Sequence, residues 1–285
     1  MKVVFVVNPI SGGADKSFLF HVQRHLDFSK ISYSIVYTEY AGHAEQLARD
    51  AVADIIVAVG GDGTVNEVAR GIAGSDKVLG IIPCGSGNGL AYHLGISRNY
   101  KKALSVIKEG HIVSMDEGVV CGHSFFCTCG VGLDANVSLV FSRSKKRGFL
   151  TYVTDTYKVW KQYKPEEYKI IVDGVEYAGR AMLVTVGNAN QWGNQARITP
   201  LASVSDGFLD MTILQPINFL EIPAIAFLLM TGHLYRSRKV VHKKGRRMVI
   251  HRARSGVAHI DGDPVFLGDK LDISIKEGCV KVLVM

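Results

Sequence analysis

The sequence predicts an α/β protein in two parts, an N-terminal doubly wound, mostly parallel α/β domain followed by an antiparallel β-sandwich domain. Up to about residue 118, short apolar runs alternate with helical patterns of about ten residues, which is typical of βαβ units. Beyond that point, strand-like runs follow one another through hairpin turns. A chain of 285 residues is long enough for two domains. We expect the first domain over residues 1–122 and the second over residues 123–285.

The first domain is predicted from four continuous apolar runs rich in β-branched residues, at 3–7, 33–37, 54–59 and 78–82. Helical patterns accompany them over residues 14–28, 43–52, 65–73, 87–94 and 99–109. Strands that are apolar at every position are buried on both faces of a parallel sheet. Ligands of such sheets bind at the carboxyl ends of the strands.

The second domain is predicted from the two-residue turn Asp173-Gly174, which joins strand-like residues 168–172 to 175–177. Further strands are expected over 181–187, 208–214, 247–252, 257–260, 271–276 and 280–284, with helices near 146–163 and 217–235. This succession favours an antiparallel sandwich or barrel. The sequence leaves open whether the last strand returns to the first domain.

Three glycine-rich turns follow buried strands of the first domain. They are Asn8 to Gly13, Gly60 to Thr64 with the following Val65-Asn66-Glu67, and Pro83 to Asn88. Glycine allows a backbone to approach a phosphate closely, and a helix that begins after the turn adds N–H groups and its positive dipole end. A single turn of this kind is often only tight packing, but three on neighbouring strands predict one anion site.

The turns match neither standard nucleotide fingerprint. The sequence has no G-x-x-x-x-G-K-[ST] motif, and no G-x-G-x-x-G opens the helix after the first strand. Asp62 instead stands between glycines. Because a carboxylate repels a phosphate unless a divalent cation or a proton lies between them, Asp62 favours Mg²⁺-dependent phosphoryl transfer.

Six motifs together resemble the lipid kinases that share the diacylglycerol kinase and sphingosine kinase catalytic domain. The Gly60-Gly61-Asp62-Gly63-Thr64 motif also occurs in NAD kinases and phosphofructokinases, but the six in this order are specific. The others are Asn8-Pro9-x-Ser11-Gly12, Pro83-x-Gly85-Ser86-x-Asn88, Gly130-x-Gly132-x-Asp134-Ala135, Ser205-Asp206-Gly207-x-Leu209-Asp210 and Asp261-Gly262-Asp263-Pro264. The resemblance covers nearly the whole chain and implies an active site in the cleft between the two domains.

The resemblance also implies a set of ATP-contacting positions in the first domain. These are Asn8, Pro9, Ile10, Ser11, Gly12, Thr38, Gly61, Asp62, Gly63, Thr64, Val65, Asn66, Glu67, Ser86 and Asn88. It places Asp62 near the phosphates and their Mg²⁺, in an acidic network that includes Asp134.

Further implied residues lie in the second domain. Asp206 matches a second, structural Mg²⁺ site, which uses backbone carbonyls here supplied by Ser203 and Phe208. Asp263 matches the proton acceptor for the lipid hydroxyl, and the neighbouring Asp261 is the alternative acceptor. A carboxylate suffices for this role, because phosphoryl transfer needs alignment, charge neutralisation and a late proton acceptor.

The expected function is therefore a lipid kinase that transfers the γ-phosphoryl group of ATP, with Mg²⁺, to diacylglycerol or a sphingoid base. Two alternatives remain open: a kinase for a soluble substrate, of the NAD kinase type, and a nucleotide- or lipid-binding regulator without catalysis. The regulator alternative follows from Asp263, because the family commonly has the longer glutamate there. The oligomeric state, monomer or homodimer, is open too.

The positive charge of the chain is concentrated in one region. Lys and Arg exceed Asp and Glu by seven, 33 against 26, yet residues 222–260 contain nine basic residues and no acidic one. These nine are Arg236, Arg238, Lys239, Lys243, Lys244, Arg246, Arg247, Arg252 and Arg254. Because they follow the most apolar helix, we expect the region Arg236 to Arg254 to dock on an anionic membrane surface, at about 1 kcal/mol per basic residue. No nucleic-acid motif accompanies them, and a solvated basic face is the simpler alternative.

The chain is expected to be cytoplasmic and only peripherally associated with membranes. Its start has too few apolar residues for a signal peptide, and the longest apolar run, near 222–230, is far shorter than the ~20 residues of a spanning helix. Five cysteines favour reduced thiols. Cys121, Cys127 and Cys129 lack zinc-site spacing, so we expect buried structural thiols rather than metal ligands.

Overall fold

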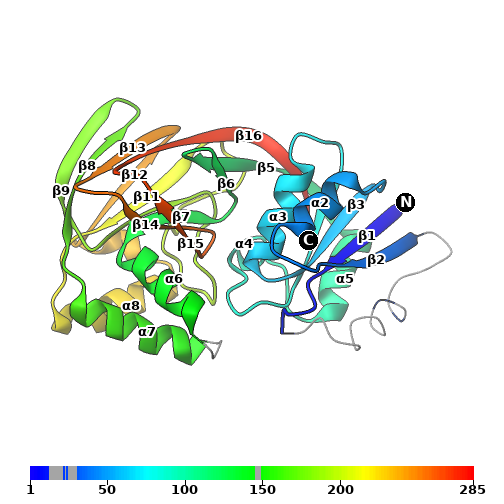
Figure 1. The fold of residues 1–285 in the computed structure, drawn as a ribbon, viewed down its shortest axis with the longest axis horizontal. Helices are drawn as coiled ribbons and strands as arrows, with labels where there is room; N and C mark the ends of the chain where they lie inside the picture. The colour runs from blue at the N-terminus through cyan, green and yellow to red at the C-terminus, as the bar shows by residue number, and fades with distance from the viewer. Residues whose placement is uncertain (13–21, 23, 25–30, 145–148) are drawn as a thin grey trace. The chain divides into compact units, whose positions relative to one another are not determined.

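A computed structural model describes residues 1–12, 22, 24, 31–144 and 149–285 (Figure 1). The helix predicted near 14–28 lies outside the described residues. Contacts divide the chain into two compact units, which we describe separately. Unit 1 comprises Met1–Asp116 with Glu277–Met285, and unit 2 comprises Glu117–Lys276.

Unit 1 contains the predicted parallel sheet. Strands β1 (Lys2–Val7), β2 (Ser32–Tyr37), β3 (Ile55–Gly60) and β4 (Val78–Pro83) pair in the order β2-β1-β3-β4, all in parallel. Every residue of β3 and β4 is buried. This burial is the reason that their sequences are apolar without alternation.

Four helices of unit 1 have described bounds: α2 (His43–Asp50), α3 (Asp62–Ile72), α4 (Gly89–His93) and α5 (Tyr100–Glu109). The main difference from prediction is the start of α3. It begins at Asp62, three residues earlier than the apolar pattern indicated, because the extended Gly61 precedes it as N-cap residue. The helix start therefore lies inside the glycine-rich motif itself.

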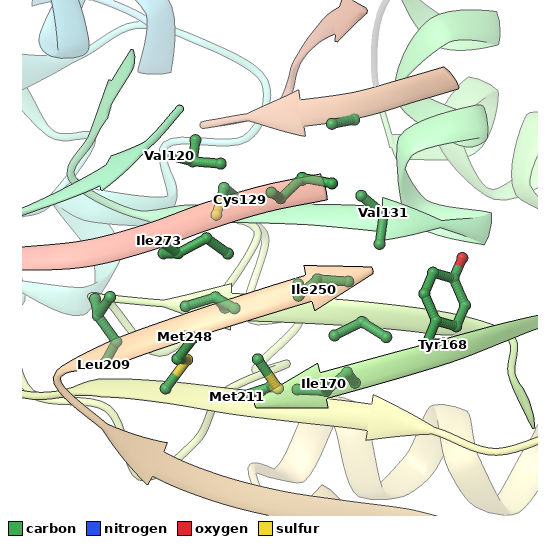
Figure 2. Close-up of a cluster of buried hydrophobic side chains, with 14 of the residues drawn as sticks. Val120, Cys129, Val131, Tyr168, Ile170, Leu209, Met211, Met248, Ile250 and Ile273 are labelled. Atoms are coloured by element: carbon green, nitrogen blue, oxygen red, sulfur yellow. The ribbon is translucent and has the colours of Figure 1, made fainter. Parts of the chain in front are cut away.

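Unit 2 contains the predicted sandwich. One antiparallel sheet has the order β12 (Val240–Gly245), β11 (Leu209–Leu214), β10 (Leu183–Gly187), β7 (Thr128–Gly132), β14 (Gly256–Ile260) and β15 (Asp263–Leu267). Opposite it lie β13 (Arg247–Arg252), β8 (Glu166–Val172), β9 (Val175–Ala181) and part of β16 (Lys270–Val284). Figure 2 shows the side chains between the sheets, among them Val131, Met211, Ile170 and Ile250, which form the largest core cluster of this unit.

Helices α6 (Leu133–Arg143), α7 (Phe149–Gln162) and α8 (Ile222–Thr231) complete unit 2, with short 3₁₀ turns η1 (Phe219–Glu221) and η2 (Leu234–Arg236) around α8. A smaller apolar cluster, built around Leu183, Ile198 and Leu234, receives side chains of α7 and α8. Among the helices of the described residues, none is long and apolar enough to cross a membrane.

The end of the chain differs from prediction. The segments 271–276 and 280–284 are one strand, β16, rather than two. Gly278 caused the error, because a glycine interrupts the apolar alternation in the sequence and so resembles the end of a strand. In the structure its φ is 60°, and its N–H donates to Asp116 Oδ1 at 2.8 Å. Near its end, Lys281 and Val282 of β16 pair in parallel with β4, so the last residues belong to unit 1. Strands β5 (His111–Val120) and β6 (His123–Phe125), which sequence reasoning did not predict, pair with each other.

Candidate active site

The predicted nucleotide-binding turns lie side by side at one edge of the unit 1 sheet. Backbone hydrogen bonds connect the residues that follow each strand: Asn8 N donates to Val59 O at 3.0 Å, and Cys84 N donates to Gly60 O at 2.8 Å. Thr38 N, after β2, donates to Val7 O at 2.9 Å. Strand order reverses between β1 and β3, which is where open α/β sheets bind ligands.

Two of the turns touch through glycines. A Cβ atom on Gly85 would lie 2.5 Å from the Cα of Gly61 and 2.9 Å from Oδ1 of Asn88. Such distances are impossible for a real side chain, so the glycine at 85 permits the packing of one turn on the other. By contrast, a Cβ atom on Gly12 would meet nothing within 4 Å in the described structure.

Asp62 joins the second turn to the third. Its carboxylate accepts hydrogen bonds from Asn88 N at 2.8 Å and Gly89 N at 2.6 Å, at the start of α4. Asn88 is buried and left-handed, with φ of 55°, and its side-chain amide bonds both N–H and C=O of Gly85 at 2.9 and 2.7 Å. The predicted site residues Asp62 and Asn88 thus shape the third turn.

Glu67 has a structural role that sequence reasoning missed. Its carboxylate accepts from Gly42 N at 2.8 Å and Ala44 N at 3.1 Å, and so caps the start of α2. The resemblance had placed Glu67 against ATP. A residue pair separated by 25 positions leaves no local signal of such a cap in the sequence.

The start of α3 differs from the starts of its two neighbours. Carboxylates of α3 cap α2 and α4, whereas α3 itself begins after Gly61, an N-cap residue without a side chain. A helix start leaves its first N–H groups without partners inside the helix and carries the positive end of the dipole. A helix start that follows a glycine-rich turn is suited to an anion.

The other predicted ATP-contacting residues surround this helix start. Pro9, Ile10, Gly12 and Ser86 are exposed, and Ser11, Thr38, Gly61, Gly63 and Asn66 are half-buried. Thr64 and Val65 are buried, so their side chains face the interior of unit 1. Asn8 Nδ2 donates to Thr64 Oγ1 at 3.1 Å, which fixes the first turn to α3.

In unit 2, the two carboxylates proposed as proton acceptors differ in surroundings. Asp261 accepts three backbone hydrogen bonds, from Phe126 N at 2.9 Å, Cys127 N at 2.8 Å and Thr128 N at 2.9 Å. Asp263, the first residue of β15, is exposed. Asp261 therefore fixes the turn that carries Asp263.

Asp134 lies in a buried polar row across three strands. Thr185 of β10 and His259 of β14 are both register partners of Gly130 on β7. Asp134, in the first turn of α6, accepts from the Thr185 hydroxyl and lies 3.1 Å from His259 Nε2. A Cβ atom at position 130 would lie 2.5 Å from Asp134 Oδ2, so the glycine makes room for this contact. The predicted link from Asp62 to Asp134 joins the two units and stays a prediction.

The predicted second metal site contains a lysine. Asp206 Oδ2 accepts from Lys244 Nζ at 2.7 Å, and Asp206 Oδ1 accepts from Phe208 N at 3.1 Å. Lys244 also lies 3.9 Å from Asp210 Oδ2 and 5.4 Å from the Phe208 ring. Among the described residues, no three His, Cys, Asp or Glu side chains gather as a metal site. The one carboxylate of the set Asp206, Ser203 and Phe208 is paired with an ammonium group here, and the metal site at these residues stays a prediction.

These unit 2 residues do not form one cluster. Asp210, Gly187 and Thr128 are register partners across β11, β10 and β7, and Asp261 N donates to Thr128 O at 2.8 Å. The Asp206 region and the Asp261 turn therefore lie at one end of the sheet, about 14 Å apart by three strand spacings.

The predicted basic docking region is only partly an exposed surface. Arg252 is buried, and its guanidinium donates to the carbonyl oxygens of Val257, Gly256, Leu267 and Gly268. Its inclusion in a docking surface was therefore wrong. Lys239, Lys244 and Arg247 form ion pairs with Glu221, Asp206 and Asp272. Arg236, Arg238, Arg246 and Arg254 are exposed. Of the three cysteines expected to be buried, Cys121 is exposed at a turn, which corrects that expectation.

Comparison with protein families gives two adjacent matches. The family model described as the diacylglycerol kinase catalytic domain matches residues 2–120. The model described as the YegS C-terminal NAD kinase beta sandwich-like domain matches residues 127–284. The two matches follow the change from βαβ pattern to hairpins that the sequence shows.

Similar proteins and structures agree with these matches. The chain is 30% identical over 267 residues to a diacylglycerol kinase of Bacillus subtilis (strain 168), covering 90% of this chain and 88% of the relative. It is 29% identical over 214 residues to a diacylglycerol kinase of Staphylococcus aureus (strain bovine RF122 / ET3-1), covering 74% and 68%. The crystal structure of a diacylglycerol kinase from Bacillus anthracis str. Sterne has the same fold, with a TM-score of 0.78 at 22% identity over 100% of this chain and 97% of that one. Another solved structure from that organism reaches a TM-score of 0.83 at 25% identity, with the same coverage.

Proposed function

Because this chain belongs to the diacylglycerol kinase catalytic-domain family, we propose that it is an ATP-dependent lipid kinase. The reaction moves the γ-phosphoryl group of ATP to a free hydroxyl of a lipid. Diacylglycerol is our first choice of acceptor because the similar proteins are diacylglycerol kinases, and a sphingoid base is the second.

The observation that carries this proposal is the position of the start of α3, inside the second glycine-rich turn and next to the third. The positive dipole end of α3 there favours an anion, and Asp62 and Glu67 hold the neighbouring helices α4 and α2 in place around it. The exposed turn residues beside it, including Ile10 and Ser86, are then available to the rest of the nucleotide. Because Thr64 and Val65 are buried, their proposed contacts with ATP involve the backbone.

Asp62 is the proposed residue for the Mg²⁺ that accompanies ATP. Carboxylate oxygens are ligands that Mg²⁺ prefers in proteins, and Asp62 stands at the start of α3 beside the glycine-rich turns. A divalent cation bound there would neutralise charge on the phosphates. Its amide partners hold the carboxylate in one orientation.

Asp263 is the proposed proton acceptor for the attacking hydroxyl. Asp261 has its oxygens occupied by three N–H donors and serves as a positioning residue for the turn. Asp263 is exposed and follows after one glycine, so its carboxylate is accessible to a substrate. The placement of the active site between the two domains stays a prediction.

Product identification tests the proposal. The full chain is incubated with Mg·ATP and, separately, diacylglycerol, a sphingoid base, ceramide, NAD or no acceptor. We expect a phosphorylated lipid in the diacylglycerol or sphingoid-base reaction. Phosphorylated NAD would select the soluble-substrate alternative, which the NAD kinase-like description of the second match keeps relevant, and no product would select the regulator.

Variants then assign the site. Asp62→Asn keeps the shape of the side chain but removes its charge, so turnover is expected to be lost, with only the small drop in melting temperature that a weakened cap of α4 causes. Asp76→Asn is the matched control, because Asp76 is exposed and forms a surface ion pair with Lys281 at 2.7 Å. Near-normal phosphotransfer by Asp62→Asn would refute the assignment.

We also propose that the protein works in the cytoplasm, at the surface of an anionic membrane. A lipid acceptor resides in a bilayer, and the exposed basic residues Arg236, Arg238, Arg246 and Arg254 favour negative lipid head groups. The five cysteines, all within the described residues, form no disulfide with one another there, which suits a reducing compartment.

A further inference from the structure

The outer side of α8 is apolar and exposed. Its inner side chains, Ile225, Leu228 and Leu229, pack against the smaller core cluster of unit 2. On the outer side, Phe227 is 67% exposed and Met230 is 41% exposed, and η1 adds Phe219 at 62% and Leu220 at 85%. Because α8 from Ile222 to Thr231 contains no charged residue, it has no polar face for contact with solvent.

The apolar surface continues onto α7 through aromatic side chains. The ring of Phe219 lies 6.2 Å from that of Trp160, which lies 6.3 Å from Tyr157. Tyr157 is 49% exposed, and Val153 one turn earlier is 46% exposed. Trp and Tyr are the residues that favour the boundary between membrane and water. We call η1, α8 and these α7 residues the apolar tip.

Basic side chains border the apolar tip. The Lys161 ammonium lies over the Tyr157 ring at 5.6 Å, and the Arg236 guanidinium lies over the Tyr235 ring at 5.7 Å. Glu221 is the acidic residue within the tip, and it is engaged by the backbone of Asn218 and by Lys239 at 3.4 Å. The tip therefore presents apolar side chains with a net positive border.

We propose that the apolar tip inserts into the interfacial region of an anionic bilayer, with Phe219, Leu220 and Phe227 among the acyl chains. The positive border favours lipid over a protein partner, since it matches a dense layer of phosphate head groups. The inference rests on the proposed lipid kinase function for its biological sense, but vesicle binding tests it without ATP or catalysis.

Co-sedimentation of the full chain with vesicles tests the tip directly. Phosphatidylcholine vesicles are compared with vesicles that contain one third phosphatidylglycerol. Wild-type protein is expected to bind the anionic vesicles, and the double variant Leu220→Glu/Phe227→Glu to bind at least tenfold more weakly. Val52→Glu is the matched control, because Val52 of unit 1 is 84% exposed and should leave binding unchanged. Equal melting temperatures show that the variants are folded.

A spectroscopic measurement adds the depth of insertion. The chain has two tryptophans, so Trp192→Phe leaves Trp160 as the only indole. Bromine atoms on the acyl chains are expected to quench Trp160 in anionic vesicles, and the double Glu substitution is expected to abolish the quenching. Binding without quenching would mean that charge alone holds the protein, and would overturn insertion.

The outcomes separate this inference from the proposed function. The tip is supported as a membrane contact if the double variant loses turnover on diacylglycerol in vesicles but retains turnover on a short-chain diacylglycerol in solution. Wild-type protein that ignores anionic vesicles, or a double variant that binds as well as wild type, overturns the inference whatever the kinase assay shows. If analytical ultracentrifugation shows that the wild-type protein is a dimer and the double variant a monomer, the tip is a subunit interface, which would also overturn the inference. Failure of every lipid to accept phosphate would overturn the proposed function alone.

Discussion

The candidate-site carboxylates of the two units have two kinds of partner, backbone N–H groups in unit 1 and at Asp261 of unit 2, and basic side chains at Asp206 and Asp134 of unit 2. In unit 1, Asp62 and Glu67 accept hydrogen bonds from the backbone and so hold helix starts in place. In unit 2, Asp206 faces a lysine and Asp134 faces a histidine. Carboxylates bound to the backbone determine the shape of a loop, whereas those bound to a basic side chain set the local charge.

The difference also separates the residues that bind from those that support. In unit 1 carboxylates cap α2 and α4, and the start of α3 between them is the anion site that we propose. In unit 2 the backbone-bound Asp261 leaves the exposed Asp263 for chemistry. In both units, therefore, a carboxylate bound to N–H groups stands beside the group that we propose to act. Four substitutions test this comparison, from the largest expected effect to the smallest.

Asp134→Ala should have the largest effect on stability. It removes the acceptor of the Thr185 hydroxyl and the partner of His259 in the interior of unit 2. Breaking a buried polar pair costs about 3 kcal/mol, because the remaining groups lose their partners. Urea unfolding measures the loss, and Asp76→Ala is the exposed control. A loss as small as that of the control would show that the row does not stabilise unit 2.

Gly85→Ala should come next, because its Cβ would overlap the backbone of Gly61. Overpacking of this kind costs about 1–3 kcal/mol, and here it also separates the two turns at the ATP site. We expect a lower melting temperature together with weaker binding of an ATP analogue, measured by calorimetry. Gly12→Ala, whose Cβ meets nothing within 4 Å in the part of the chain that the structure describes, should keep the wild-type melting temperature. Equal behaviour of the two variants would contradict the packing account.

Glu67→Gln tests the cap of α2. The neutral amide keeps one acceptor oxygen but loses the charge that two N–H groups of residues 42 and 44 engage. A lost cap costs about 1 kcal/mol, so we expect a small drop in stability from thermal unfolding and faster amide exchange at the start of α2. Abolished turnover with full stability would instead return Glu67 to the ATP-contacting role that the family resemblance implies.

Lys244→Met should have the smallest effect, below about 1 kcal/mol, because the ion pair with Asp206 is partly exposed. The hydrogen bond to Asp206 raises the pKa of Lys244, so its contribution is complete below the ordinary lysine pKa and is lost as pH rises through the raised value. The difference between wild type and variant should therefore vanish at strongly alkaline pH.

Metal removal sharpens the same test. If Lys244 supplies the positive charge at Asp206, EDTA should leave the melting temperature of the wild-type protein unchanged. In Lys244→Met the carboxylate loses its cation, and added Mg²⁺ should raise the melting temperature. A wild-type protein that EDTA destabilises would restore the structural metal site implied by the family resemblance.

The sequence predicted the parts whose signal is local. Continuous apolar runs indicated the parallel strands, since residues such as Val57 and Ile81 are buried on both faces of the sheet. The glycine-rich turns indicated the position of the anion site, because a chain reversal after a buried strand needs residues that tolerate close approach. The motifs around Asp62 and Asp134 also identified the family, which the comparisons then showed.

Errors arose where local pattern and tertiary contact disagreed. The charge run Arg236 to Arg254 was expected on the surface, but four carbonyl groups draw Arg252 into the sandwich. Strand β16 was divided in two because Gly278 resembles a break when its bond to Asp116 is unknown.

By itself, the sequence determined the two-part fold, the positions of its main strands along the chain and the positions of the glycine-rich turns. Only the tertiary structure decided which carboxylate supports and which is presented: Asp62 bonds residues 26 and 27 positions away, and Asp261 bonds residues 133 to 135 positions away. The physical reason is that a carboxylate has the same chemistry at every position. Its role depends on the N–H groups and cations that folding brings to it, and those come from distant parts of the chain.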